Sequence, residues 1–163
     1  YHSTATKLGE ALGNRGINLV YGGGRTGLMG AVADGVLNSG GEVTGVIPDY
    51  LSDRELGHQG LTRLEIVKSM HERKRRMFDL ANAIVVLPGG IGTLEETLEI
   101  ITWKQLGMHN KPVIILNFNN YWQKLDELIS NAIDNGFAKQ PTQELYDLVC
   151  SPGEVMSMLE KKN

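Results

Sequence analysis

Short runs of β-branched and aliphatic residues alternate along the chain with longer segments in which apolar residues recur every three or four positions. The short runs predict strands, the longer segments predict helices, and their alternation predicts an α/β fold. Strands are expected at residues 17–21, 43–47, 64–67, 83–87, 112–116 and 146–150. Helices are expected at residues 27–39, 70–82, 94–105, 121–135 and 152–160, and around Ala5, Leu8, Ala11 and Leu12 at the N-terminus.

The most apolar strands indicate how the sheet is covered. The runs IVVL and VIIL are apolar on both faces, which is typical of a parallel sheet flanked by helices on both faces. We therefore expect a doubly wound parallel sheet that forms a single domain over residues 1–163. A strand normally precedes the first helix of such a domain, so we also expect an N-terminal strand that this numbering lacks.

Composition narrows the possible function classes. The chain has 163 residues, of which 41% are hydrophobic and 21% are charged, with a formal net charge of −3. This balance favours neither nucleic acid nor an anionic membrane as a partner, and no apolar run approaches the ~20 residues that span a bilayer. Cys150 is the only cysteine, which excludes an internal disulfide and is typical of a cytoplasmic protein.

A first glycine-rich loop follows the strand at residues 17–21. Gly22, Gly23 and Gly24, followed by Arg25-Thr26-Gly27, match the pattern G-x-G-x-x-G between a strand and a helix. Bare glycines let backbone N–H groups approach an anion such as a phosphate at the start of the helix. Asp49 lies ~20 residues further on, so a nicotinamide dinucleotide is one candidate ligand. A tight turn without any ligand is the alternative.

A second glycine-rich loop, Pro88-Gly89-Gly90-Ile91-Gly92-Thr93-Leu94-Glu95-Glu96, is more informative. Thr93 and Glu96 suit a helix-capping box, which would make Glu96 structural, whereas Glu95 has no such role. In the helix that follows we expect Leu94, Leu98 and Ile101 to face the core, with Glu95, Glu99 and Thr102 along a polar face. Acids beside an anion-binding turn repel a phosphate unless the substrate develops positive charge nearby.

The third candidate feature is a basic segment at residues 69–77, Ser69-Met70-His71-Glu72-Arg73-Lys74-Arg75-Arg76-Met77. Ser69 and Glu72 again suit a capping box. Arg73 and Lys74 lie between Met70 and Met77, which we expect to be buried, so we expect one of these cations to point into a site where it meets an anion.

The segment at residues 48–62 is long for a loop in a compact domain and is a candidate binding loop. It contains Asp49, Asp53, Glu55 and His58, each of which we expect by default to be solvated. His58 and His71 lie at no metal-ligand spacing with other histidines or cysteines, so we expect no metal site. The serine-nucleophile elbow and the P-loop pattern GxxxxGK[ST] are both absent from the sequence.

Together, YGGGRTGLMG, MHERK, PGGIGTLEE and ITWKQLG closely resemble the LOG family of phosphoribohydrolases, enzymes that activate cytokinins and whose homologues were long labelled possible lysine decarboxylases. The resemblance covers nearly the whole chain, and the joint presence of MHxRK and PGGxGTxxE is highly specific. Arg25-Thr26 departs from the small or apolar residues that are commoner in the first loop.

The resemblance implies a Rossmann-like fold and hydrolysis of the N-glycosidic bond of an adenosine 5′-monophosphate or an N6-substituted one, without a cofactor. The products would be the free base, adenine or a cytokinin, and ribose 5-phosphate. It also implies a homodimer with sites near the subunit interface. The catalytic candidates that it implies are Arg73, Glu95 and Glu96. The ligand-contacting positions that it implies are Glu55, Lys74, Gly89, Gly90, Ile91, Gly92, Thr93, Leu94, Glu95 and Thr102.

This chemistry is consistent with the residues themselves. Glycosidic cleavage passes through a positively charged sugar, so an acid can serve the ribose while the glycine turns hold the phosphate. Arg73 would either neutralise the phosphate or stabilise the departing base. Two alternative functions are a nucleotide-binding module without catalysis and, from the first glycine loop and Asp49 alone, a nicotinamide-dependent oxidoreductase.

Overall fold

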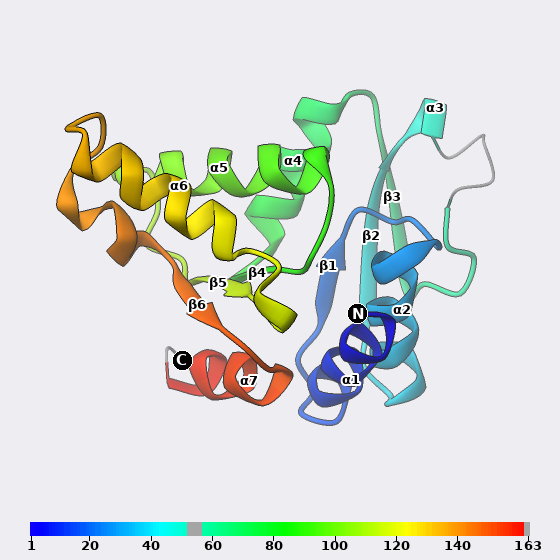
Figure 1. Ribbon diagram of the computed structural model, residues 1–163. Coiled ribbons are helices and arrows are strands. Elements are labelled where there is room, and N and C mark those ends of the chain that lie inside the picture. Colours follow the sequence, from blue (N-terminus) through cyan, green and yellow to red (C-terminus); the bar gives the residue numbers. More distant parts are fainter. Residues whose placement is uncertain (52–56, 162–163) are drawn as a thin grey trace. The chain divides into compact units, whose positions relative to one another are not determined.

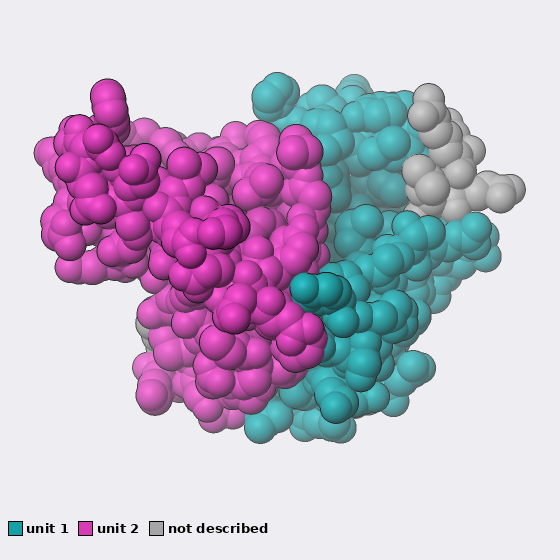
Figure 2. All heavy atoms as spheres, viewed as in Figure 1, with its two compact units in different colours: residues 1–81 teal, residues 82–163 magenta. Residues whose placement is uncertain are grey.

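The computed structural model describes residues 1–51 and 57–161 (Figure 1). The chain divides into two compact units, Tyr1–Ala81 and Asn82–Asn163, which Figure 2 colours teal and magenta. Each unit contains one three-stranded sheet and is considered by itself. The organisation of the whole chain as a single domain stays a prediction.

The first unit is built on a parallel sheet in the order β1-β2-β3. Its register pairs Leu19 with Val43 and Gly45 with Leu64. Helix α4 packs on all three strands, and α2 packs on β1 and β2. The elements are α1 (His2–Gly13), β1 (Leu19–Tyr21), α2 (Gly27–Asn38), β2 (Val43–Pro48), the single turn α3 (Asp49–Leu51), β3 (Arg63–Val67) and α4 (Met70–Leu80).

The second unit is built on a parallel sheet in the order β4-β5-β6. All four residues of β5 are buried, and its side chains Val113 and Ile115 pack with Ile101, Trp122 and Leu125 in one apolar cluster. The elements are β4 (Ile84–Val86), α5 (Ile91–Gln105), β5 (Val113–Leu116), the 3₁₀ turn η2 (Phe118–Asn120), α6 (Gln123–Asp134), the 3₁₀ segment η3 (Gln140–Leu145), β6 (Asp147–Val149) and α7 (Pro152–Lys161).

Glycines bring the backbones of α1 and α2 into contact. A Cβ atom added to Gly9 would lie 3.0 Å from the Cα atom of Gly35, and one added to Gly35 would lie 3.0 Å from the Cα atom of Gly9. One helical turn further along α1, a Cβ atom on Gly13 would lie 2.8 Å from the Cβ atom of Ser39. This seam of glycines leaves no room for side chains between the two helices.

The predicted α/β class, with parallel strands flanked by helices, is confirmed, and the strands and helices occur in the expected order. The Ser69 cap is also confirmed, since its hydroxyl accepts a hydrogen bond from the Glu72 N–H at 3.1 Å. Gly136 ends α6, with φ of 77° just after the C-cap. No helix within residues 1–51 and 57–161 combines the length and the hydropathy needed to cross a bilayer.

Candidate functional site

The first glycine loop meets the side chain of Arg73. From α4, the Nε of Arg73 donates a hydrogen bond of 3.1 Å to the carbonyl of Val46 in β2. A Cβ atom on Gly22 would lie 2.8 Å from the Cζ of Arg73 and closer still to its Nη2. The guanidinium therefore lies directly against the backbone at the carboxyl end of β1, the sheet edge where ligands of open α/β folds bind.

The other residues expected around Arg73 are less buried than the sequence predicts. None of the residues of α4 is fully buried, and Met70 is exposed, so the prediction of a buried face at Met70 is wrong. Lys74, like Arg73, is half-buried. The helix is instead tied to the sheet by charge, because Arg76 donates two hydrogen bonds, of 2.6 and 3.0 Å, to the carboxylate of Glu65 in β3. These bonds lower the pKa of Glu65.

His58 holds the first glycine loop from the other side. Its backbone N–H donates to the carbonyl of Gly23 at 2.9 Å. Its Nδ1 accepts the N–H of Gly60 at 3.1 Å, so Nε2 bears the proton that bonds the Asp34 carboxylate at 2.9 Å. The expectation of a solvated His58 is wrong, because the side chain is only 12% exposed. The imidazole joins this loop to α2.

Tyr21 ends β1 immediately before Gly22, and its side chain is buried. Burial, together with the negative charge of Asp34, raises the pKa of the Tyr21 hydroxyl. This group therefore stays protonated at neutral pH and contributes no negative charge beside the first glycine loop.

The second glycine loop forms the start of α5. The helix begins at Ile91 with Gly90 as its N-cap, and the N–H of Leu94 already donates to the carbonyl of Gly90 at 3.1 Å. Thr93 is therefore inside the helix, and the predicted capping box of Thr93 and Glu96 is wrong. The sequence does not indicate that α5 begins at Ile91, because its N-cap Gly90 has no side chain that a capping pattern could identify.

The start of α5 is suited to bind an anion. Helix geometry leaves the N–H groups of Ile91, Gly92 and Thr93 without partners inside the helix, and the helix dipole adds partial positive charge there. A Cβ atom on Gly90 or Gly92 would meet nothing within 4 Å. The backbone of this turn is thus uncovered where the side chains of Gly90 and Gly92 would be.

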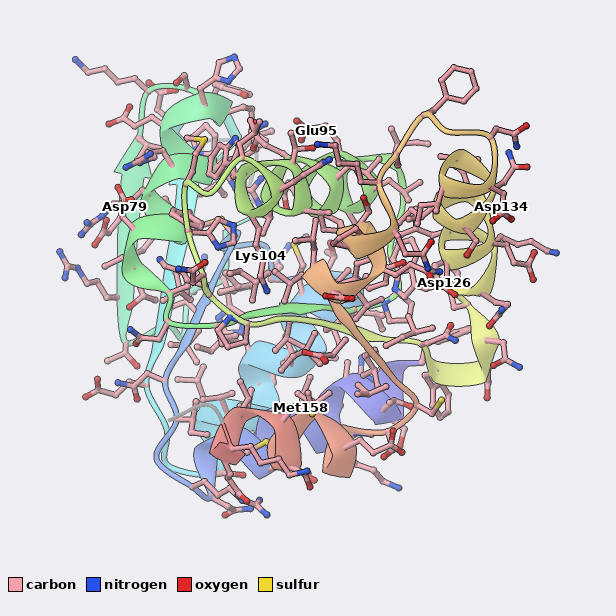
Figure 3. All side chains as sticks on the ribbon, turned by 90° about the vertical axis from the view of Figure 1, so that its left-hand side faces the viewer. Asp79, Glu95, Lys104, Asp126, Asp134 and Met158 are labelled. Atoms are coloured by element: carbon pink, nitrogen blue, oxygen red, sulfur yellow. The ribbon has the colours of Figure 1, made fainter. Side chains whose placement is uncertain are left out.

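The two acids lie on the second turn of α5, past the glycine turn at its start. Glu95 is exposed and appears on α5 in Figure 3, and Glu96 is half-buried. Since Glu96 does not lie at the third helical position, the capping role predicted for it falls away. Thr102 is exposed on the same helix, and its hydroxyl donates to the carbonyl of Leu98 at 2.7 Å.

The core face of α5 differs from the predicted one. Leu98, expected in the core, is 43% exposed, whereas Thr97 and Ile101 are buried. Thr97 can occupy a core position because its hydroxyl donates to the carbonyl of Thr93 at 2.6 Å, which satisfies the polar group within the helix. A count of apolar residues alone cannot anticipate this arrangement.

The predicted site residues thus fall into two groups. Within the first unit, the structure brings Gly22, the first of the three loop glycines, against Arg73. Within the second unit it places the glycine turn and the acids at the start of α5. Glu55 lies outside the described residues. Among the residues that the structure does describe, no group of three or more His, Cys, Asp or Glu side chains could hold a metal ion.

One residue near the second loop has no signal in the sequence. The hydroxyl of Tyr121 donates a hydrogen bond of 2.6 Å to the carbonyl of Gly89, 32 positions earlier. The contact arises because β4 and β5 are neighbouring parallel strands, so the segments that follow them lie at the same edge of the sheet.

Comparison with known proteins gives a matching family model and close sequence relatives, of which two are described. The family model with the description "Possible lysine decarboxylase" matches residues 29–159. The probable cytokinin riboside 5′-monophosphate phosphoribohydrolase LOGL2 of Oryza sativa subsp. japonica is 43% identical over 161 residues, 99% of this chain and 66% of its own. The cytokinin riboside 5′-monophosphate phosphoribohydrolase of Rhodococcoides fascians is 45% identical over 151 residues, 92% of this chain and 76% of its own.

A solved structure supports the fold. The molybdenum cofactor binding protein of Rippkaea orientalis is similar with a TM-score of 0.75 over 98% of this chain and 86% of that one. Its sequence is 17% identical, so this likeness concerns the fold alone.

Proposed function

Because the chain belongs to the LOG family of phosphoribohydrolases, whose family model has the description "Possible lysine decarboxylase", we propose that it hydrolyses nucleoside 5′-monophosphates. The bond cleaved is the N-glycosidic bond of adenosine 5′-monophosphate or of an N6-substituted adenosine 5′-monophosphate. The products are ribose 5-phosphate and the free base, adenine or a cytokinin. The observation behind this proposal is the 45% identity over 92% of the chain to the Rhodococcoides fascians phosphoribohydrolase.

The phosphate of the substrate binds to backbone N–H groups. The bare start of α5, at Gly90 and Gly92, supports this role, since neither position has neighbouring atoms where a side chain would be. The loop of Gly22, Gly23 and Gly24 is the second such turn. The remaining substrate-binding residues in this proposal are Glu55, Lys74, Gly89, Ile91, Thr93, Leu94 and Thr102.

The acids serve the sugar. As the bond from C1′ to the base breaks, its electron pair leaves with the base, and positive charge develops on C1′ and the ring oxygen. A carboxylate of the pair Glu95 and Glu96 stabilises this charge and accepts a proton from the water that attacks C1′. The departing base takes up a proton. Because the glycine turn binds the phosphate and the acids act on the sugar, both can lie on one helix.

Arg73 supplies the positive charge of the site. Its guanidinium either neutralises the phosphate or stabilises negative charge on the departing base. The two roles differ in kinetics: loss of phosphate binding raises KM, whereas loss of leaving-group stabilisation lowers kcat. The bond to Val46 fixes the position of Nε in either case.

The proposal includes a homodimer in the cytoplasm. Apolar side chains at the start and middle of α5 are exposed, with Ile91 at 81% and Leu98 at 43%. Exposed apolar residues on a helix that bears substrate-binding groups support a partner subunit there. Sedimentation analysis of the purified chain, with Leu98→Glu as the disrupting variant, tests this part of the proposal.

The test of the activity is chromatography of free base released from AMP and from isopentenyladenosine 5′-monophosphate. Glu96→Gln and Arg73→Ala are expected to fold and to release the base ~10²–10⁴-fold more slowly than the wild type. Glu10→Gln and Arg15→Ala are matched controls on α1 and just after it, and they should keep full activity. Saturable AMP binding without base release by the wild-type chain would instead indicate a nucleotide-binding module.

A further inference from the structure

The hydroxyl of Tyr121 controls one peptide group of the second glycine loop. It donates a 2.6 Å hydrogen bond to the carbonyl of Gly89. On the other side of Gly89, a Cβ atom would lie 2.8 Å from the Cβ of Thr93, which is packed over the turn. Gly89 is therefore held between an aromatic hydroxyl from beyond β5 and a side chain from the first turn of α5.

This bond also orients an N–H group. The peptide that joins Gly89 to Gly90 is planar, and in the trans form its carbonyl and its N–H point in opposite directions. Because Tyr121 fixes the direction of the Gly89 carbonyl, it also fixes the direction of the Gly90 N–H. Gly90 is the N-cap of α5, so this N–H adjoins the N–H groups at the start of the helix.

The backbone just before Tyr121 adopts an unfavourable left-handed conformation. Asn119 and Asn120, the two residues before it, have φ values of 54° and 57°, in the left-handed region that non-glycine residues seldom occupy. A hydrogen bond of 2.7 Å from the Trp122 N–H to the buried Oδ1 of Asn117 holds this turn in place. Strained backbone of this kind persists where the surrounding structure enforces it, often beside functional sites.

We propose that Tyr121 is a positioning residue that holds the glycine turn before α5 in the conformation that binds the substrate's phosphate. The inference rests on the proposed function, since it assigns the phosphate to that turn. Tyr121 acts through the peptide between Gly89 and Gly90 and takes no part in bond cleavage. Loss of its hydroxyl should therefore weaken binding of the ground state and of the transition state equally.

The variant Tyr121→Phe removes the hydroxyl and keeps the ring. We expect KM for AMP to rise about three- to tenfold, the loss of one hydrogen bond, with kcat unchanged. Tyr146→Phe is the matched control, because its hydroxyl donates a bond of similar length, 2.7 Å, to Asp126 on α6 (Figure 3). Tyr146 is more buried than Tyr121, so a KM change caused by general destabilisation would be larger in the control.

Binding of ribose 5-phosphate, measured by calorimetry, separates this inference from the proposed activity. If the wild-type chain binds ribose 5-phosphate but releases no base, the proposed activity fails, and a three- to tenfold weaker affinity of Tyr121→Phe still supports the inference. Equal affinity of the two proteins, or an equal loss in Tyr146→Phe, overturns it. A wild-type chain that neither binds ribose 5-phosphate nor cleaves AMP overturns both.

Discussion

A single methyl group at Gly22 should inactivate the protein while leaving it folded. In Gly22→Ala the new Cβ atom would lie 2.8 Å from the Cζ of Arg73 and closer to its Nη2. Ordinary contacts between heavy atoms are ~3.5 Å or more, so the Cζ of the guanidinium would have to move by about 1 Å and its Nη2 by about 2 Å. It is the mobile end of a long side chain, and it can move where the backbone of β1 cannot.

The expected magnitudes follow from that displacement. Moving the guanidinium strains or breaks the bond from Nε to the Val46 carbonyl, which costs about 0.5–1.5 kcal/mol of unfolding free energy. Replacing glycine by alanine raises the free energy of unfolding by about 0.4–1 kcal/mol, because the unfolded chain loses conformational entropy. The net change should stay within about 1 kcal/mol, or about 2–4 °C in Tm for a chain of this size. A displacement of ~1 Å at a catalytic group, by contrast, costs on the order of 100-fold in rate.

The assay compares base release from AMP with thermal unfolding for Gly22→Ala, Arg73→Ala and the double variant. Because the methyl group acts through Arg73, the double variant should be no slower than Arg73→Ala alone. Gly153→Ala is the control, since its Cβ atom would meet only the Ser151 Oγ at 3.9 Å. Full activity of a folded Gly22→Ala, or additive losses in the double variant, would refute the reasoning.

Three further predictions concern stability. The bonds from Arg76 lower the pKa of Glu65 from 4.5. Their contribution to the free energy of unfolding is therefore present above about pH 4.5 and is lost as the pH falls through the lowered pKa. In urea unfolding, the free energy of unfolding of Glu65→Gln should depend less on pH in the acid range than that of the wild type. Asn120→Ala should lower the unfolding free energy by ~1 kcal/mol, because alanine tolerates φ of 57° poorly, whereas Asn120→Gly should stay within about 0.5 kcal/mol of wild type. Ile114→Ala should cost ~2–5 kcal/mol in the same assay, since Ile114 is fully buried in β5, and a cost below about 1 kcal/mol would contradict this packing.

Much of the fold could be predicted because local signals agree with it. Apolar runs such as VIIL occur where a strand is buried on both faces, and the caps at Ser69 and Gly136 depend only on residues within one turn. The basic segment singled out Arg73 and Lys74 as candidates to point into a site, and the structure places Arg73 against Gly22. These features require no knowledge of distant contacts.

The errors arise where a distant contact or a backbone group replaces a side-chain signal. Gly90 caps α5 through its backbone, so a pattern search assigns the cap to Thr93. Thr97 enters the core through a hydrogen bond that hydropathy ignores, and Leu98 is left exposed. The bond from Tyr121 to Gly89 spans 32 residues, and it depends on the pairing of two strands.

The glycines shared by α1 and α2 have a consequence for how the first loop is placed. Gly9 and Gly13 are separated by one helical turn, and the residues between them have side chains that the gap against Gly35 cannot admit. The helices therefore cannot slide along each other by a single residue, and the contact of these glycines fixes the position of α2 along the axis of α1. Since the loop after β1 runs directly into α2, a shift of that helix would also move Gly22 relative to Arg73, so the contact between α1 and α2 helps to set the position of the first glycine loop.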